Sequence, residues 1–566
     1  MKNESGSTII IIILIVGMFF LFNSLKGGSC SNDAKNSQSP PPALKADSNQ
    51  QPSELSSQPQ IQADSLVLQN KKLKISLIAW QYRPGFRISR VELKNFKKNK
   101  EINTTERIPV TLLDKPSTFF DILGKTDSSY QTLRFEGITD TSITLVWMDT
   151  LDAEKQSIKI PLYLSNYELH FTQQDSTALL RVDCENGLNT TEPRDKSEKT
   201  LFQLYYYDGQ NNVGWLNISK IKKYEKGKLD IESGPYKWLA LRTKYFAAIL
   251  MPSTAVTGRI EPKRTFDSRI GLSFNCFGSK DYTLFFGPLD YDLMAQLGKR
   301  LHKPRLTRIV ELGGSAFRWL GVAILKLFQF LYKLIPNYGI AIIIFSILIK
   351  LIFLPLSRSQ QQSMHKMQMI QPKIKEIQER FKDDQQRQYA ETQRLYKNHG
   401  VSPLGGCLPM LIQMPVFFGL YGVLRNNIAL RGAPFVNLFH LHIDKAINLF
   451  NFIRIPAGDL VWLADLSQHD PFYILPILMG IASIIQALRT NVDPKQRTTA
   501  FIFPIIITAV FLNFPSGLQL YWLIFNVLSI IESTVFKRGR TGGIQWEKQQ
   551  NKEIPSGKNL QKSSRS

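Results

Sequence analysis

Lys350 lies within an apolar stretch, Tyr338 to Leu356, that is long enough to cross a bilayer as a helix. A charged side chain at the centre of a span costs about 2.5–3.5 kcal/mol on insertion scales, so this lysine requires an explanation. Ser346 stands four residues before it and Ser357 seven after it, which places the three on one helical face. One interpretation is that the amine snorkels to the nearby head groups. The other, which the serines favour, is a wet cavity inside the helix bundle.

Other isolated polar side chains occur at membrane depth in later apolar segments. They are Gln413, Gln486, Thr508, Gln519 and Asn526. Each alone is more often an interhelical hydrogen bond than a site. Together with Lys350 they predict a hydrated pocket, open to the cytoplasm, whose positive charge attracts an acidic or polar segment of an incoming protein.

The sequence offers little for catalysis. The membrane half shows no nucleophile beside a base and no phosphate-binding loop, and the four cysteines have no metal-ligand spacing. We therefore expect a protein that is not an enzyme and that needs neither a cofactor nor a metal.

The composition indicates a soluble part joined to a membrane part. The chain has 566 residues, too many for one domain, and its apolar runs are concentrated in the second half. The formal net charge is +24, yet no compact nucleic-acid-binding motif is present, so no sequence-specific nucleic-acid partner is expected. Cytoplasmic loops and tails that meet anionic lipids or the ribosome account for such an excess.

The N-terminal region is predicted to hold an anchor and a linker. Thr8 to Phe22 is almost entirely apolar and is either a signal peptide or an uncleaved anchor. No A-x-A site follows, and a glycine stands where a lipoprotein signal ahead of Cys30 would need leucine. We therefore expect an uncleaved transmembrane anchor over residues 1–25, then a Ser-, Gln- and Pro-rich disordered linker over 26–62.

Residues 63–305 are predicted to form an all-β sandwich domain. Short alternating segments are separated by turn residues: 72–78, 86–93, 142–147, 167–172, 178–182, 201–206, 247–251 and 282–286, with a closing helix near 290–301. His170, the only histidine between residues 63 and 288, is expected to pack or to face solvent. Cys184 and Cys276 either pair, if the domain is extracytoplasmic, or remain as two free buried thiols.

The second half is predicted to be an α-helical membrane core. Its parts are an amphipathic interfacial helix at 306–336, a transmembrane helix at 337–356, a cytoplasmic helical hairpin at 357–402, four further transmembrane helices within 403–536, and a basic cytoplasmic tail at 537–566. The positive-inside rule then places both termini and every short basic loop in the cytoplasm.

The hairpin carries apolar residues at helical spacing. Met364, Met367 and Ile370 begin a seam on its first arm, and Asp383-Asp384 is expected to form its turn. Pro372 either kinks that arm or starts its main helix. Simple packing of the two arms and an adaptable surface for varied apolar segments explain the seam equally well.

Three sequence motifs resemble the YidC/Oxa/Alb family of membrane protein insertases. They are Gly400-Val-Ser-Pro-Leu-Gly-Gly-Cys-Leu-Pro-Met-Leu-Ile-Gln-Met-Pro415, Asp470-Pro-Phe-Tyr-Ile-Leu-Pro-Ile-Leu-Met-Gly480 and Phe514-Pro-Ser-Gly-Leu-Gln-Leu-Tyr-Trp522. The resemblance covers the whole chain in architecture, and in motif it covers residues 338 to about 538.

The resemblance implies a substrate groove open to the cytoplasm and to lipid. Its residues here would be Lys350, Ser346, Gln413, Tyr521 and Trp522, with Lys350 in the position of the family's usual arginine. Lysine keeps the charge but lacks the planar fork that captures a carboxylate through two bonds.

The resemblance also implies partners and a location. The expected partners are nascent membrane proteins received by the hairpin, the Sec translocon, the lipid bilayer, and the ribosome through the basic tail and cytoplasmic loops. The expected location is the bacterial inner membrane, with the β domain in the periplasm as a β-super-sandwich.

Three functional hypotheses follow. The first is a membrane protein insertase and chaperone, acting alone or with the Sec translocon. The second is a transporter of small molecules or ions with Lys350 as the substrate counter-ion, which the small, odd number of core spans without detectable repeats disfavours. The third is an assembly scaffold in which the β domain binds periplasmic partners and the spans only anchor it.

Overall fold

The structure is a computed structural model that divides into two compact units. The β unit is residues 1–311 with 426–428, and the helical unit is the remainder. The described residues run from 64 to 541, with gaps at 81–83, 98–108, 115–117, 123–129, 150–156, 193–195, 209–211, 226–230, 232, 266, 401–407, 436–437, 444–446, 450–452, 456–457, 464 and 490–493. The expected anchor, the linker and most of the basic tail therefore lie outside the described residues.

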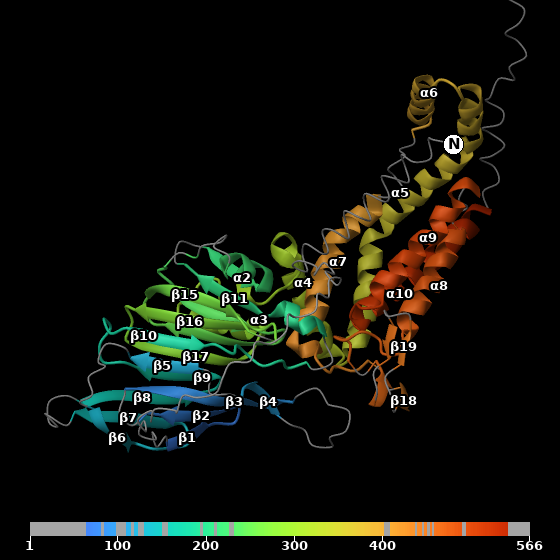
Figure 1. Ribbon diagram of the computed structural model, residues 1–566. Helices are drawn as coiled ribbons and strands as arrows, with labels where there is room; N and C mark the ends of the chain where they lie inside the picture. The colour runs from blue at the N-terminus through green and yellow to red at the C-terminus, as the bar shows by residue number, and fades with distance from the viewer. Residues whose placement is uncertain are drawn as a thin grey trace, which may run out of the picture. The chain divides into compact units, whose positions relative to one another are not determined.

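The β unit contains two antiparallel sheets (Figure 1). The eight-stranded sheet comprises β1 (Asp64–Gln69), β2 (Leu73–Ala79), β3 (Gly85–Lys97), β5 (Thr118–Ile122), β10 (Leu180–Cys184), β16 (Ile270–Phe277) and β15 (Thr257–Arg264) in spatial order, with β4 (Pro109–Leu113) paired to β3. The nine-stranded sheet comprises β12 (Val213–Asn217), β11 (Gln203–Tyr207), β13 (Trp238–Arg242), β14 (Phe246–Pro252), β17 (Asp281–Pro288), β9 (Glu168–Thr172), β8 (Ser157–Ser165), β7 (Ser142–Asp149) and β6 (Tyr130–Glu136).

Alternating side chains explain why these segments form strands that are buried on one face. In β8 the even-numbered residues from Ile158 to Leu164 are buried, while their neighbours face outward. A small apolar cavity of about 40 Å³ is lined by residues of β4, β10 and β16 and of β13, β14 and β17. The two sheets therefore pack face to face, and the predicted sandwich is confirmed.

All eight strand segments expected from the sequence coincide with observed strands, namely β2, β3, β7, β9, β10, β11, β14 and β17. Several others were not anticipated. β13, for example, is buried along its whole length, so it shows no alternation. The short helices η1 (Lys196–Leu201) and α2 (Ile218–Glu225) were also missed.

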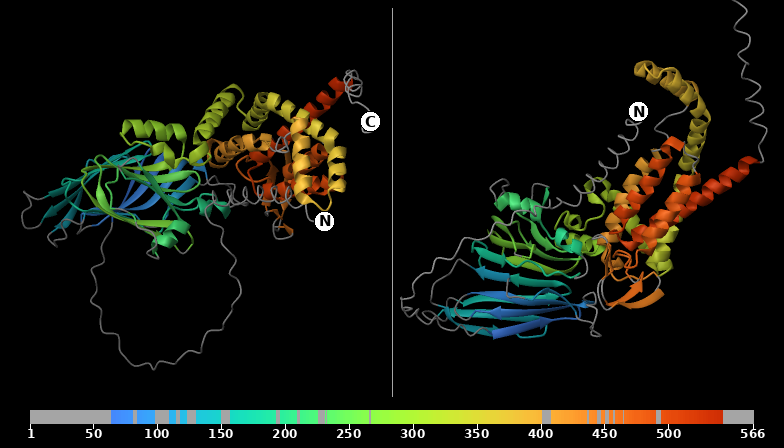
Figure 2. Two further views of the ribbon diagram at one scale, coloured as in Figure 1. Left: turned by 90° about the horizontal axis from the view of Figure 1, so that it is seen from above. Right: turned by 45° about the vertical axis from the view of Figure 1, so that its right-hand side comes forward.

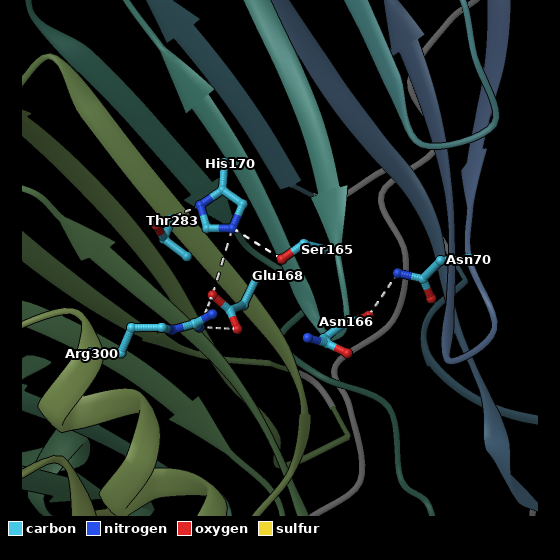
Figure 3. A network of polar contacts seen from close by, with 7 residues as sticks. All are labelled: Asn70, Ser165, Asn166, Glu168, His170, Thr283 and Arg300. Atoms are coloured by element: carbon cyan, nitrogen blue, oxygen red, sulfur yellow. Dashed lines mark hydrogen bonds and ion pairs between the residues drawn. The ribbon is translucent and has the colours of Figure 1, made fainter.

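The expected closing helix is α3 (Tyr291–Arg300), which begins after the N-cap Asp290. Arg300 forms an ion pair with Glu168 of β9, and the Glu168 side chain is only 6% exposed. Figure 3 shows this pair beside His170, whose Nδ1 lies 3.0 Å from Thr283 Oγ1. His170 is thus a half-buried residue that packs on the sheet, as expected.

Cys184 and Cys276 are both free and buried. They lie on the adjacent strands β10 and β16, where Cys184 pairs with Leu272 and Cys276 pairs with Leu180. The two cysteines are thus four positions apart in the ladder, about 13 Å at about 3.3 Å per residue. A disulfide needs Cα atoms less than about 7 Å apart, so this register excludes the pairing and leaves two free thiols.

The helical unit contains α4 (Gly314–Leu334), α5 (Tyr338–Arg380), α6 (Gln385–Asn398), α7 (Leu408–Asn426), η3 (Ile428–Leu430), α8 (Ile474–Arg489), α9 (Pro494–Phe511) and α10 (Ser516–Thr541). The last residue of α7 and the first residue of η3 belong to the β unit. Tyr338–Ser363 and Ser516–Val535 are long and apolar enough to cross a membrane, and Ile474–Leu488 is a shorter apolar helix. In α4, Ile324, Phe328 and Leu331 are buried while Lys326 and Lys333 are exposed. The expected position of this helix in the membrane interface stays a prediction.

α5 passes without interruption from the expected span into the expected hairpin. It is 43 residues long and contains both Pro355 and Pro372, so Pro372 does not start a new helix. Figure 2 shows the hairpin at the end of α5, where α6 turns back after the N-cap Asp384. The expected turn at Asp383-Asp384 is confirmed.

The segment between α7 and α8 holds two small two-stranded sheets that the sequence did not predict. β18 (Leu438–Ile443) pairs with β21 (Gly458–Trp462), and β19 (Ile447–Leu449) pairs with β20 (Ile453–Ile455). Asp470, fully buried, then accepts hydrogen bonds from the backbone N–H groups of Phe472 and Leu475. This side chain satisfies donors at the start of α8, which gives the Asp470-Pro-Phe motif a structural role.

Both thiols of the β unit are expected to be unreactive in the folded chain. Burial raises the pKa of the Cys276 thiol to about 12, with Tyr282 partly opposing this, so almost no thiolate is present at pH 8. In a Cys30→Ser/Cys407→Ser variant, iodoacetamide should leave the native protein unmodified and add two labels in urea, as read by mass spectrometry. Native labelling, or a mass two units lower from a disulfide, would contradict the structure.

The β unit is expected to lose stability in mild acid because of His170. Burial and the nearby Arg300 hold the pKa of its imidazole below the ordinary 6.5, while Glu168 opposes them. The stability that the neutral ring provides is therefore complete above pH 6.5 and is lost as the pH falls through the folded pKa. The urea midpoint of the β-unit transition in the full chain should fall over this window and should do so less in His170→Asn. An equally steep fall in that variant would rule His170 out as the cause.

Candidate functional site

The candidate site lies between α5 and α10, which run parallel to one another. A Cβ added to Gly517, at the start of α10, would lie 3.1 Å from the Ile342 side chain. Further along, the rings of Phe345 and Tyr521 are 5.9 Å apart. Contacts therefore advance in the same direction along both helices, and the small Gly517 lets their first turns approach closely.

Lys350 ends in a buried ion pair with Glu532 of α10. Its Nζ lies 2.8 Å from Glu532 Oε2, and each of the two side chains is 9% exposed. The same ammonium donates a hydrogen bond to Ser529 Oγ at 2.7 Å and lies 4.8 Å from the centre of the Phe525 ring. The lysine is thus neutralised within the bundle, an arrangement that differs from both snorkelling and a free charge in water.

Glu532 is bonded to two residues of α5, Lys350 and Ser357. Its Oε2 also accepts a hydrogen bond from Ser357 Oγ at 2.9 Å, so Lys350 and Ser357 share one carboxylate oxygen. Oε1 of the same carboxylate is buried and has no hydrogen-bond partner among the described residues. The cluster Lys350–Ser357–Ser529–Glu532 therefore leaves one strong acceptor unfilled.

Two other predicted groove residues form a separate pair. Gln413 Nε2 donates to Tyr521 Oη at 3.1 Å, and Tyr521 is fully buried. Trp522, by contrast, packs in an aromatic group, with ring centres 5.9 Å from Phe417 and 5.1 Å from Phe511. The structure thus brings Gln413 to Tyr521 but does not join either of them to Lys350 by a hydrogen bond.

Four of the five remaining polar groups at membrane depth donate hydrogen bonds to nearby atoms. Ser346 is buried and donates to the carbonyl of Ile342 in its own helix, and Thr508 does the same to Pro504. Asn526 donates to Ser483 Oγ of α8 at 2.8 Å. Gln519 donates to the carbonyls of Phe511 and Phe514 at the end of α9. The bonds of Ser346 and Thr508 thus lie within one helix, and that of Asn526 links two helices. Gln519 fills carbonyls where α9 ends, while its own Oε1 is buried without a hydrogen-bond partner among the described residues.

The predicted hairpin residues divide between packing and exposure. Ile370 is buried, and Met367 is half-buried. The structure does not describe the side chain of Met364. Met369, which lies outside the predicted seam, is 54% exposed. Packing of the seam is thus visible at Ile370, and Met369 supplies exposed apolar surface.

Glu532 is the site residue that sequence reasoning missed. It lies inside the last predicted span, but it was not counted among the polar groups at membrane depth. A usable signal was present, because Asn526, Ser529 and Ser533 repeat at helical spacing and Glu532 stands three residues after Ser529. The stripe predicts a polar face on the last span.

Comparison with known proteins decides the family. The family described as YidC periplasmic domain matches residues 66–327, and the family described as 60Kd inner membrane protein matches residues 330–542. The membrane protein insertase YidC of Nitratidesulfovibrio vulgaris is 35% identical over 421 residues, which are 72% of this chain and 72% of that protein. The chain belongs to the YidC family of membrane protein insertases.

Other relatives match shorter stretches. The YidC insertase of Geotalea daltonii is 36% identical over 326 residues, 55% of this chain and 56% of that protein. The YidC insertase of Geobacter metallireducens is 40% identical over 313 residues, 53% of this chain and 52% of that protein. A solved structure titled as an active YidC insertase covers 84% of this chain and 94% of its own, at 17% identity and a TM-score of 0.35. Family membership rests on the sequence matches, which also identify the β unit as a YidC periplasmic domain and this chain as an inner membrane protein.

The Lys350–Glu532 pair of this YidC family member should behave as one energetic unit. Lys350→Gln or Glu532→Gln alone leaves a buried charge without its partner, which costs about 3–5 kcal/mol. The double variant should recover most of that loss. Unfolding in detergent measures the cycle, and Ser533→Ala, whose hydroxyl bonds only within its own helix, serves as the control. Additive single losses would show that the two residues are not coupled.

Proposed function

We propose that this chain inserts, folds and helps to assemble integral membrane proteins in the bacterial inner membrane, alone or with the Sec translocon. The observation that carries the proposal is the Lys350–Ser529–Glu532 cluster held between two apolar helices. A bilayer-spanning helix retains such groups against their insertion cost where they serve a function. Lowering the cost of bringing polar chain into the bilayer is a use that requires no catalytic group.

Within this proposal, Lys350, Ser346, Gln413, Tyr521 and Trp522 belong to the substrate groove, which is hydrated and opens to the cytoplasm. The Gln413–Tyr521 hydrogen bond and the Lys350 cluster supply polar groups from three helices, α5, α7 and α10. Polar side chains that already have partners in the resting protein can exchange them for a passing segment without leaving any group bare.

On the cytoplasmic side, the hairpin receives the substrate and the basic tail helps to dock the ribosome. Met364, Met367 and Ile370 form its apolar contact, and the exposed Met369 extends the surface. Methionine suits varied partners because its side chain is unbranched and flexible. The tail at 537–566 and the cytoplasmic loops dock the ribosome, since clustered Lys and Arg attract its phosphate backbone.

In this topology both termini are cytoplasmic, residues 1–25 anchor the chain, and residues 63–305 lie in the periplasm. The spans are the anchor, the first part of α5, and the four helices of residues 403–536. The basic composition of the hairpin and of the tail supports this orientation.

Reconstituted protein should insert a short single-span substrate without other proteins. Protease protection of the translocated end should lie well above empty liposomes, and Lys350→Arg should retain it. Lys350→Ala should lower it about tenfold or more, because truncating one member of a buried charge pair leaves the other unpaired. Protection no greater than in empty liposomes for the wild type would refute insertion by the chain alone.

A double variant tests whether insertion needs the positive charge of Lys350 or only the absence of an unpaired buried charge. Lys350→Gln/Glu532→Gln carries no unpaired charge, so its loss of activity would show that the lysine itself is needed. Full activity in this variant would show instead that Lys350→Ala fails only because Glu532 is left alone. Arg318→Gln, on the amphipathic α4, is the matched control that removes a cation outside the site.

A further inference from the structure

The pair between Lys350 and Glu532 changes the charge that the groove offers to a substrate. Their nearest atoms are 2.8 Å apart, and both side chains are nine-tenths buried. At this distance the two opposite charges form a dipole, which attracts a carboxylate several ångströms away much more weakly than a free ammonium would. An incoming carboxylate therefore meets a neutral pair in which the place beside the ammonium is already filled.

The second carboxylate oxygen of Glu532 offers a different contact. Oε1 is buried and has no hydrogen-bond partner among the described residues, while Oε2 is held by Lys350 and Ser357. A buried carboxylate oxygen without a donor binds hydroxyl, amide or ammonium groups strongly. A donor-bearing segment that displaces the packing over Oε1 can thus add a hydrogen bond there while Lys350 and Ser357 keep theirs at Oε2.

We propose that Glu532 determines the charge specificity of the groove. Segments rich in Ser and Asn, or other uncharged donors, bind at Oε1 of the intact pair, whereas acidic segments bind only after displacing Glu532 from Lys350. This inference rests on the proposed insertase function and deepens it by naming the preferred substrate class. A groove with a single unpaired positive charge would instead favour acidic segments.

A purely structural role predicts something different. If the pair only fastens α5 to α10, loss of Glu532 weakens the protein and lowers the insertion of every substrate by the same factor. A ratio of two substrates, measured in one preparation, is insensitive to the amount of folded protein. The ratio therefore separates specificity from fastening.

The test uses the full chain in proteoliposomes without an imposed membrane potential. Two single-span substrates differ only in the translocated tail, which carries either two Asp or two Asn residues. The protected fraction of the Asp substrate divided by that of the Asn substrate should be one or less in the wild type. In Glu532→Gln, where Lys350 becomes a free cation, the ratio should rise about fivefold or more, the lower end of typical couplings between sites. Glu136→Gln, an exposed carboxylate of the β unit, should leave it unchanged.

Two results would overturn the proposal. One is a ratio well above one in the wild type, a result that can be obtained even if Glu532→Gln fails to reconstitute. The other is the same ratio in Glu532→Gln as in the wild type. Failure of the wild type to insert either substrate would count against the proposed function itself, so the two failures are distinguishable.

Discussion

A charge in the apolar interior of a bundle is tolerated only beside an opposite charge, and this constraint organises the helical unit. The attraction between Lys350 and Glu532 offsets the loss of hydration only if the ammonium and the carboxylate touch. Contact requires α5 and α10 to run side by side with a fixed register. Gly517 lets their first turns approach, and Phe345 against Tyr521 fixes the next level. Ser529 and Glu532 then stand level with Lys350.

The register of α10 is also set from its beginning. The backbone N–H groups of Ser516 and Gly517 donate to the carbonyls of Gln468 and Leu466, in the segment that leads into α8. Gln519 fills carbonyls at the end of α9. The Phe-Pro-Ser-Gly517 turn therefore fixes the ends of α8, α9 and α10 at one point. A change in that turn would shift the Lys350–Glu532 ion pair, although the pair lies several helical turns further along α10.

Sequence patterns predicted the architecture well because the governing signals are local. Alternation located eight strands of the sandwich, and apolar length located the helices of the membrane core. Strands buried on both sides, such as β13, lack alternation and escaped detection. Proline often ends a helix, yet α5 continues through both Pro355 and Pro372.

The candidate site was predicted only in part, because its chemistry depends on partners far apart in sequence. The sequence identifies Lys350 because it is a charge in an apolar run. Whether its amine contacts water, lipid or a carboxylate depends on the register of α10. Gln519 and Ser346 are polar side chains of the kind that can line a groove, but in the structure they donate to backbone carbonyls. Likewise, the register of β10 against β16 decides that Cys184 and Cys276 do not form a disulfide. Residue type alone does not reveal such choices.

Pro355 gives the long α5 a joint beside the ion pair. Proline has no N–H, so the carbonyl of Leu351 loses its helical hydrogen bond, and bending is easiest at this turn. Lys350 lies on one side of that joint and Ser357 on the other, and the same oxygen of Glu532 is bonded to both. The carboxylate therefore bridges the turn that Pro355 weakens. Bending of α5 at this turn would move Ser357 relative to Lys350, so it would strain the bonds that both make to Glu532.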